Sequence, residues 1–258
     1  MKKFICLLVL GFVLIAGVAF AEEKKEELQI TVGVKTWYNK WSEKFDTEYG
    51  SGKDRFVTRK SDYVLAVGPA ISFKKGPYFG GISYLQAASD YKFDLTYRTS
   101  DTERTHYVES TSRYDIDALV GYYFHPRVGG FAGYKYAHYK EIIDKDILDN
   151  SGNITSRRSN TESLNLHGPV IGLTANYPIG STGLTPFLTV SYLWVRSVNE
   201  DNPVNSANQY GPSAELGIGY TIKKFTFTAA YKQQTYYFDN ETGYIKFGGP
   251  IFSVNYTF

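Results

Sequence analysis

Apolar and polar residues alternate along most of this chain, in strand-length segments separated by polar breaks. Because successive side chains of a strand point to opposite faces, each segment predicts a strand with one apolar and one polar face. We predict an all-β fold of about ten strands, with eight or twelve as the alternatives. The expected strands are residues 28–41, 62–73, 78–92, 113–124, 128–140, 162–177, 184–195, 209–222, 225–237 and 244–258.

The breaks between these strands alternate in length. Short breaks follow the second, fourth, sixth and eighth strands, whereas longer polar breaks follow the first, third, fifth and seventh. This arrangement is typical of an antiparallel up-and-down transmembrane β-barrel, with short turns on one side of the membrane and long loops on the other. The longer breaks are expected to be loops over residues 42–61, 93–112, 141–161 and 196–208.

Gly-Pro pairs recur in four of the expected strands. Proline cannot donate a ladder hydrogen bond, so inside a sheet it belongs at a strand start or a bulge. We therefore expect four β-bulges that bend the strands for closure, with ordinary loops as the alternative. The pairs are Gly68-Pro69, Gly168-Pro169, Gly211-Pro212 and Gly249-Pro250.

The two faces of the expected strands differ in charge. One face is uncharged, as in the series from Tyr114 through Ile116 to Phe124. A Lys or Arg at the lipid-facing midplane of a barrel costs about 2 to 4 kcal/mol, so this face is predicted to contact lipid. The opposite face is predicted to line the lumen, and its charged residues are Lys35, Arg113, Asp115, Asp117, Lys135, Glu215 and Lys232.

The size of the barrel bears on whether the lumen is open. About eight strands leave an interior just filled by side chains, whereas 16 or more leave an aqueous channel. Ten strands with mixed charges inside therefore predict a narrow or plugged lumen.

Composition supports a membrane barrel. The chain has 23 Tyr and 24 Gly, aromatic residues make up 17% of it, and the mean hydropathy is −0.30. A closed barrel accounts for this combination, because aromatic girdles flank its apolar band while every second residue is polar.

The final strand carries a family resemblance. Phe252, Val254, Tyr256 and Phe258 alternate with small or polar residues. Ser253 departs from the pattern described next, which favours glycine at this position. The pattern resembles the C-terminal strand of bacterial outer-membrane β-barrels, here the small porin-like and OmpA/OmpX-like superfamily. The resemblance implies that these four residues are an assembly signal for the barrel-assembly machinery. It also implies outer-membrane lipid and lipopolysaccharide as partners.

The N-terminal region resembles a secretory signal. Lys2 and Lys3 precede an apolar run, and Ala19-Phe20-Ala21 fits a cleavage site. We predict a signal peptide over residues 1–21 and one barrel domain over 22–258, with a retained membrane anchor as the alternative. Without Lys2 and Lys3 the basic residues, 28 in the whole chain, equal the 26 acidic ones, which does not favour a nucleic-acid partner.

Candidate chemistry is limited. Asp115 and Asp117 could form an acid/base pair, as acidic residues and a His do at the rim of the ten-stranded omptin proteases, but a salt-bridge cluster with Arg113 is favoured. A contact of His138 with Asp115 across the sheet is a further hypothesis. The four His lack ligand spacing and the only cysteine is Cys6, so no metal or cofactor is predicted.

Three functions remain at this stage. The favoured one is a non-enzymatic structural barrel that presents surface loops over a narrow or plugged lumen. The alternatives are a porin-like channel for small solutes and, less favoured, a barrel enzyme of the omptin-like or lipid-modifying kind.

Overall fold

The computed structural model describes residues 27–46, 56–98, 103–149, 151–200, 206–239 and 243–258. The predicted signal peptide lies outside these residues and stays a prediction. Within the described ranges no helix is long and apolar enough to cross a membrane. The strands are β1 (Gln29–Asp46), β2 (Phe56–Lys75), β3 (Tyr78–Ala87), β4 (Tyr91–Arg98), β5 (Glu103–His125), β6 (Val128–Asp149), β7 (Ile154–Asn176), β8 (Leu184–Asn199), β9 (Ser206–Ile222), β10 (Phe225–Phe238) and β11 (Tyr244–Thr257).

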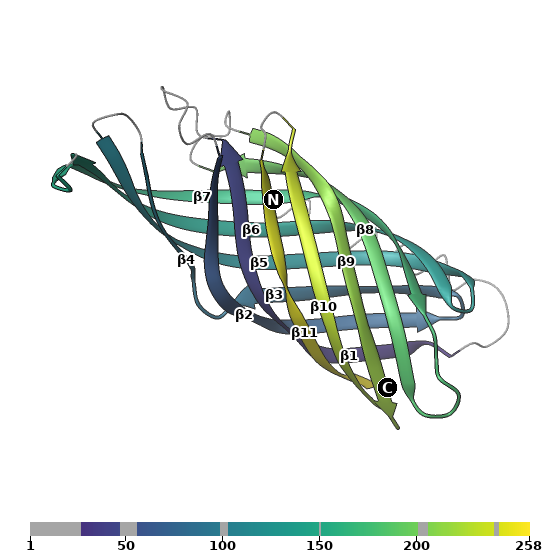
Figure 1. The fold of residues 1–258 in the computed structure, drawn as a ribbon. Helices are drawn as coiled ribbons and strands as arrows, with labels where there is room; N and C mark the ends of the chain where they lie inside the picture. Colours follow the sequence, from purple (N-terminus) through teal and green to yellow (C-terminus); the bar gives the residue numbers. More distant parts are fainter. Residues whose placement is uncertain (1–26, 47–55, 99–102, 150, 201–205, 240–242) are drawn as a thin grey trace.

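The strands form one closed antiparallel barrel (Figure 1). Consecutive strands pair with one another except β3 and β4, and β11 returns to pair with β1. Both β3 and β4 pair with β5, so they are two halves of one barrel strand interrupted at residues 88–90. The prediction of ten barrel strands is confirmed.

The strands reach further than the alternation indicated. Within the segments predicted as loops, the structure has strand at residues 42–46, 56–61, 93–98, 103–112, 141–149, 154–161, 196–199 and 206–208. The β6–β7 hairpin extends farthest from the body of the barrel (Figure 1). This hairpin ends in a tight turn in which the side chain of Asp149 accepts a hydrogen bond of 2.8 Å from the backbone N–H of Ser151. Gly152 supplies the positive φ of 83° that the turn requires.

The expectation of four bulges at the Gly-Pro pairs is wrong. At each pair the ladder to one neighbouring strand is interrupted, but the register is the same before and after, so no residue is inserted. The glycines instead permit a close approach of backbones. A Cβ on Gly249 would lie 2.0 Å from the carbonyl oxygen of Tyr38, and Gly168 meets that of Trp194 at the same distance. Proline leaves the adjoining ladder position without a donor.

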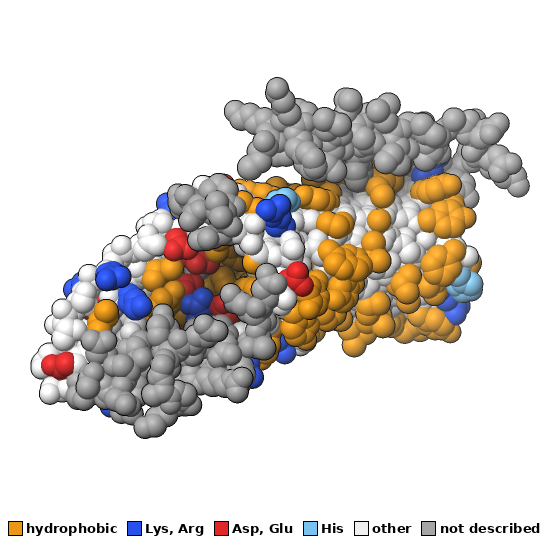
Figure 2. Space-filling view, turned by 90° about the horizontal axis from the view of Figure 1, so that it is seen from above, with side chains coloured by type: hydrophobic (Ala, Val, Ile, Leu, Met, Phe, Trp, Pro, Cys, Tyr) orange, Lys and Arg blue, Asp and Glu red, His pale blue; other side chains and the backbone are white. Residues whose placement is uncertain are grey.

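The outer wall has an apolar band between two aromatic belts. Hydrophobic side chains cover this part of the surface (Figure 2). The first belt lies beside the short turns and comprises Tyr78, Tyr122, Phe124, Tyr177, Tyr220, Phe225, Tyr256 and Phe258. The second lies further along the strands and comprises Tyr38, Tyr63, Tyr84, Tyr114, Tyr136, Tyr192, Trp194, Tyr210, Tyr237 and Tyr244. Such paired girdles mark the two interfaces of a membrane.

Candidate functional site: a filled lumen and an acidic vestibule

A layer of ion pairs crosses the lumen at the level of the apolar band. Lys135 of β6 places its Nζ 2.9 Å from an oxygen of Asp115 and 2.9 Å from an oxygen of Asp117, both on β5. Arg113, also on β5, donates a hydrogen bond of 2.7 Å from Nη2 to Asp115. The side chains of Arg113 and Lys135 are each 2% exposed. Buried charges of this kind persist only where each is paired, as here.

A second, looser pair completes the layer on the other wall. Lys35 of β1 lies 3.6 Å from Glu215 of β9, and both side chains are about one-fifth exposed. Lys232 of β10, which pairs with Glu215 in the ladder, places its Nζ 5.1 Å from the ring centroid of Trp37. The structure thus brings together in one lumenal layer all seven charged residues that the alternation assigned to the interior.

Aromatic side chains close the lumen above the charged layer, toward the long hairpins. The indole of Trp41 is 2% exposed and lies at their centre. Its ring centroid is 5.0 Å from that of Phe247, 5.3 Å from Phe93 and 5.5 Å from Tyr139, rings that come from three other strands. Trp37, Tyr91 and Tyr236 pack in the same layer. Rings from β1, β4, β6 and β11 thus pack against one another inside the barrel.

A local irregularity sets the position of Trp41. The register between β1 and β2 shifts between Lys40 and Ser42, so that Trp41 faces two residues of β2, Ser61 and Asp62. The hydroxyl of Ser61 accepts a hydrogen bond of 3.1 Å from the backbone N–H of Trp41. This β-bulge satisfies the backbone of Trp41 while its ring points into the lumen.

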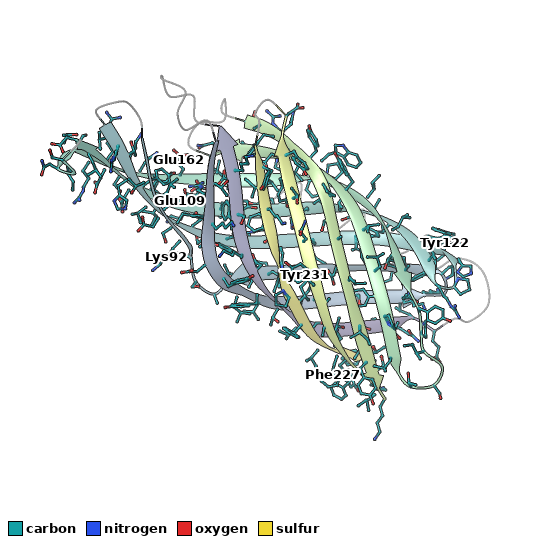
Figure 3. The ribbon with its side chains drawn as sticks, in the orientation of Figure 1. Lys92, Glu109, Tyr122, Glu162, Phe227 and Tyr231 are labelled. Atoms are coloured by element: carbon teal, nitrogen blue, oxygen red, sulfur yellow. The ribbon has the colours of Figure 1, made fainter. Side chains whose placement is uncertain are left out.

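Beyond the aromatic layer the barrel opens into a vestibule lined by carboxylates. Acidic and basic side chains are visible in the hollow mouth (Figure 2), and Glu109 and Glu162 lie at this end of the barrel (Figure 3). Arg59 places its Nη2 2.6 Å from Glu43 and also pairs with Glu109. Glu109 is fully buried and accepts a hydrogen bond of 2.8 Å from the hydroxyl of Thr111.

Two further carboxylates face each other on the vestibule wall. Glu141 of β6 pairs directly with Glu162 of β7 in the ladder. Glu162 accepts a hydrogen bond of 2.8 Å from Asn160. Arg59 therefore pairs with two of these four carboxylates, Glu43 and Glu109.

The environment of the vestibule shifts the pKa values of its groups. Burial, reinforced by the nearby charge of Glu109, raises the pKa of the Glu141 carboxyl to about 8. Burial opposes ionisation of Arg59, but Glu43 and Glu109 outweigh it and hold its pKa above the ordinary value. Glu141 thus takes up a proton near neutral pH.

Sequence reasoning did not find the vestibule, because Glu43, Glu109 and Glu141 lie in segments taken to be loops. One signal was available. Glu109 and Thr111 continue the two-residue period of Arg113 and Asp115, so the lumenal face extends without a break.

The histidines lie apart from the lumenal carboxylates. His138 stacks on Tyr114 with ring centroids 5.1 Å apart and its Nδ1 lies 3.0 Å from Oδ1 of Asn165, so it does not meet Asp115. His106 pairs with the exposed Asp94 at 3.0 Å. Within the described ranges no group of three or more His, Cys, Asp or Glu is arranged to hold a metal ion.

The C-terminal residues lie on the outer wall. Phe252, Val254 and Phe258 are 54%, 48% and 69% exposed, and Tyr256 packs edge-on against Phe258 with ring centroids 4.9 Å apart. Val254 pairs with Val34 of β1, so the strand that carries the predicted assembly signal also closes the barrel.

Comparison with known proteins finds a similar architecture in a solved structure. No family model matches the chain, and no curated protein does. The outer membrane protease OmpT from Escherichia coli has a similar structure, with a TM-score of 0.58 and 14% identity over 93% of this chain and 99% of that one. At that identity the likeness shows the fold alone.

Two other barrels are similar at a lower level that carries no argument. The attachment invasion locus protein Ail of Yersinia pestis gives a TM-score of 0.36 at 8% identity, covering 90% of this chain and 99% of that one. The toluene transporter TodX of P. putida gives a TM-score of 0.32 at 7% identity, covering 91% of this chain and 90% of that one.

The closed ten-strand barrel, its girdled apolar wall and the likeness to OmpT define the fold of an outer-membrane β-barrel. The vestibule and the long hairpins lie at the end of the barrel opposite the short turns. In single-chain outer-membrane barrels the short turns lie in the periplasm.

Proposed function

We propose that this protein is a non-conducting outer-membrane barrel that presents a blind acidic vestibule and tall hairpins at the cell surface. Its role is structural and interactive rather than catalytic. The β4–β5 and β6–β7 hairpins continue the barrel wall beyond the second aromatic belt, which supports a position for them outside the membrane.

The observation that carries this proposal is the two-layer filling of the lumen. Lys135 is bound by two aspartates, and the aromatic layer around Trp41 lies directly over the ion pairs. Opening a pore through these layers requires separating buried ion pairs and removing close-packed rings together. Asp115 and Asp117, the candidate acid/base pair, share one lysine, which favours a structural ion-pair cluster over an acid and a base.

Liposome swelling tests this proposal. Liposomes containing the purified, refolded protein are placed in iso-osmotic solutions of small sugars and amino acids, with a general porin as positive control. We expect swelling no faster than for protein-free liposomes. Swelling at a rate comparable with the porin, for any of these solutes, would show that the lumen conducts and would favour the channel alternative.

A further inference from the structure

The lumen on the short-turn side of the ion-pair layer is hollow. Within the layer the side chains of Lys135 and Asp115 are 2% and 7% exposed, whereas that of Asp117, the next inward residue of β5 toward the short turns, is 32% exposed. Ser72 shares the inward face of β2 with the buried Ala66, yet it is exposed. Inward side chains are exposed only where the interior is not filled. This space is here called the turn-side chamber.

Small residues line one wall of the turn-side chamber. A Cβ on Gly219 would have no neighbouring atom nearer than 3.7 Å, so this wall borders open space. Across the barrel the ring of Phe79 lies over Gly121 and that of Phe131 over Gly172, at 2.2 and 2.3 Å from where a Cβ would stand. These two rings therefore lie along the wall and leave the lumen free. The inward residues of the small wall, on β1 and on β9 to β11, are Gly33, Gly217, Gly219, Thr228, Ala230 and Ser253.

Lys232 is the cation of the ion-pair layer that has no carboxylate of its own. The two aspartates pair with two of the other cations, and Glu215 pairs with Lys35. Within the described ranges no carboxylate oxygen lies within ion-pair distance of Lys232, whose Nζ has the Trp37 ring at 5.1 Å instead. Its side chain is half-buried. A partly buried ammonium group without a counter-ion favours binding of an anion from solution.

The residues beside Lys232 suit the oxygen atoms of an anion. Lys35 and Thr228 are both direct ladder partners of Ser253, so these three residues form one row across the small wall. The hydroxyl oxygen of Ser253 accepts a hydrogen bond of 3.0 Å from the side-chain amide of Asn255, which leaves its own O–H to donate. Ammonium and hydroxyl donors together are the groups that bind carboxylates and phosphates.

Lys74 adds a cation at the mouth of the turn-side chamber. It lies on the inward face of β2, two residues beyond Ser72, and it is exposed. Its Nζ lies 5.5 Å from the ring centroid of Tyr123. An anion that enters from the short turns therefore passes Lys74 before it reaches Lys35 and Lys232. Cations placed along one path raise the local concentration of anions.

We propose that the turn-side chamber binds a small solute that carries an oxyanion, either a carboxylate or a phosphate group. Lys232 and Lys35 supply the positive charge, and Ser253 and Thr228 supply hydroxyl donors. Because single-chain outer-membrane barrels place their short turns in the periplasm, the solute is a periplasmic one. The site does not depend on the proposed function, since a lumen that conducts would refute a closed barrel and leave these residues in place.

Calorimetric titration of the refolded protein in detergent tests the site. The probes are succinate, inorganic phosphate and succinamide, the neutral diamide of succinate. The first test variant is Lys232→Gln. The second is Gly219→Leu, which keeps every charge and places an apolar side chain in the chamber beside Thr228. The control is Lys140→Gln, which loses the same charge from an exposed, outward position on β6. Heat-modifiable gel mobility verifies that each variant is folded.

We expect at least one of the two anions to bind the wild type and the neutral diamide not to bind. Lys232→Gln should weaken binding of that anion roughly 10- to 100-fold, as expected for loss of a hydrogen bond to a charged group. Gly219→Leu should also weaken it, and it decides the question if Lys232→Gln does not fold. Lys140→Gln should bind as the wild type does. Binding of succinate alone would support a carboxylate ligand, and binding of phosphate alone a phosphate ligand.

Four results would overturn the proposal. They are no binding of either anion, equal binding of succinate and its diamide, unchanged affinity in the folded test variants, and equal losses in Lys232→Gln and Lys140→Gln.

Discussion

The guanidinium carbon of Arg113 lies 3.7 Å from the centroid of the Phe247 ring. Arg113 is on β5 and Phe247 is on β11, and β1, β2 and β3 separate these strands along the wall. The contact therefore spans the lumen and joins the ion-pair layer to the aromatic layer. A guanidinium stacked on an aromatic face in a desolvated site is favourable, and here it fills the centre of the barrel.

Loss of Lys135 should destabilise the barrel strongly. In Lys135→Met, Asp115 retains Arg113, but Asp117 loses the lysine that pairs with it. We expect the free energy of unfolding to fall by about 3 to 5 kcal/mol, measured by urea titration in detergent micelles. Adding Asp117→Asn should restore part of this loss. A Lys135→Met variant as stable as the wild type would show that the ion pairs of Lys135 do not stabilise the barrel.

The Gly-Pro sites should be intolerant of a side chain. A Cβ at Gly249 meets the carbonyl oxygen of Tyr38 at 2.0 Å, whereas one at Gly219 meets its nearest neighbour at 3.7 Å. We expect Gly249→Ala to lower the free energy of unfolding by about 1 to 3 kcal/mol, the usual cost of overpacking. Gly219→Ala should leave the free energy of unfolding nearly unchanged. Equal urea midpoints for the two variants would contradict the close approach of β11 to β1.

Deletion of Phe258 should impair assembly more than stability. Its ring is 69% exposed, and its backbone N–H donates one hydrogen bond of 2.9 Å to Ile30. In cells we expect a several-fold loss of folded protein in the outer membrane. In the purified, refolded protein the loss of stability should be no larger than for Phe124→Ala, which removes another exposed aromatic of the same belt. A larger loss would indicate a structural role alone.

The vestibule should make stability depend on pH through Glu141. Its carboxyl has a pKa of about 8 in the folded protein against 4.5 for the ordinary group, so the folded chain holds the proton more tightly. The resulting stability is fully present below pH 4.5 and is lost as the pH rises through 8.

Urea unfolding at about pH 5 and about pH 8 measures this effect. Glu141→Gln cannot ionise and should lose less stability over this range than the wild type. Asp90→Asn, which alters an exposed carboxylate that accepts a hydrogen bond from Ser110, serves as the control and should behave as the wild type does. A wild-type protein that gains stability between these pH values, relative to Glu141→Gln, would reverse the sign of the argument.

The membrane-embedded part of the fold was readable from the sequence. Lipid requires an apolar side chain at every second position, which makes series such as Tyr114 to Phe124 conspicuous. Tyr122 and Phe124 are 46% and 61% exposed on the outer wall. The pairing of the last strand with the first also followed from the barrel architecture.

The hairpins above the membrane were not readable, because both of their faces meet water. In the segment 141–161 charged residues point outward, as where Arg157 binds Asp146 through two hydrogen bonds of 2.7 and 3.0 Å. The apolar alternation is lost there although the backbone ladder continues. Polar residues on both faces look like a loop to any rule based on burial.

The lumenal filling was only partly readable. Charges inside the band stand out, because lipid excludes them from the other face. The aromatic residues do not stand out, since Trp41 and Phe247 inside the barrel are the same residue types as Trp194 and Phe252 on its outer wall. Only the register, including the bulge at Ser61, separates the two sets.

Single-channel recording in planar lipid bilayers tests the filled lumen most directly. The refolded wild-type protein is added to a bilayer under an applied voltage, with a general porin recorded under the same conditions. The account predicts a stable baseline without discrete current steps at protein amounts that give many porin steps. Reproducible unitary steps from the wild-type protein would contradict it and would show an open path past Arg113 and Phe247.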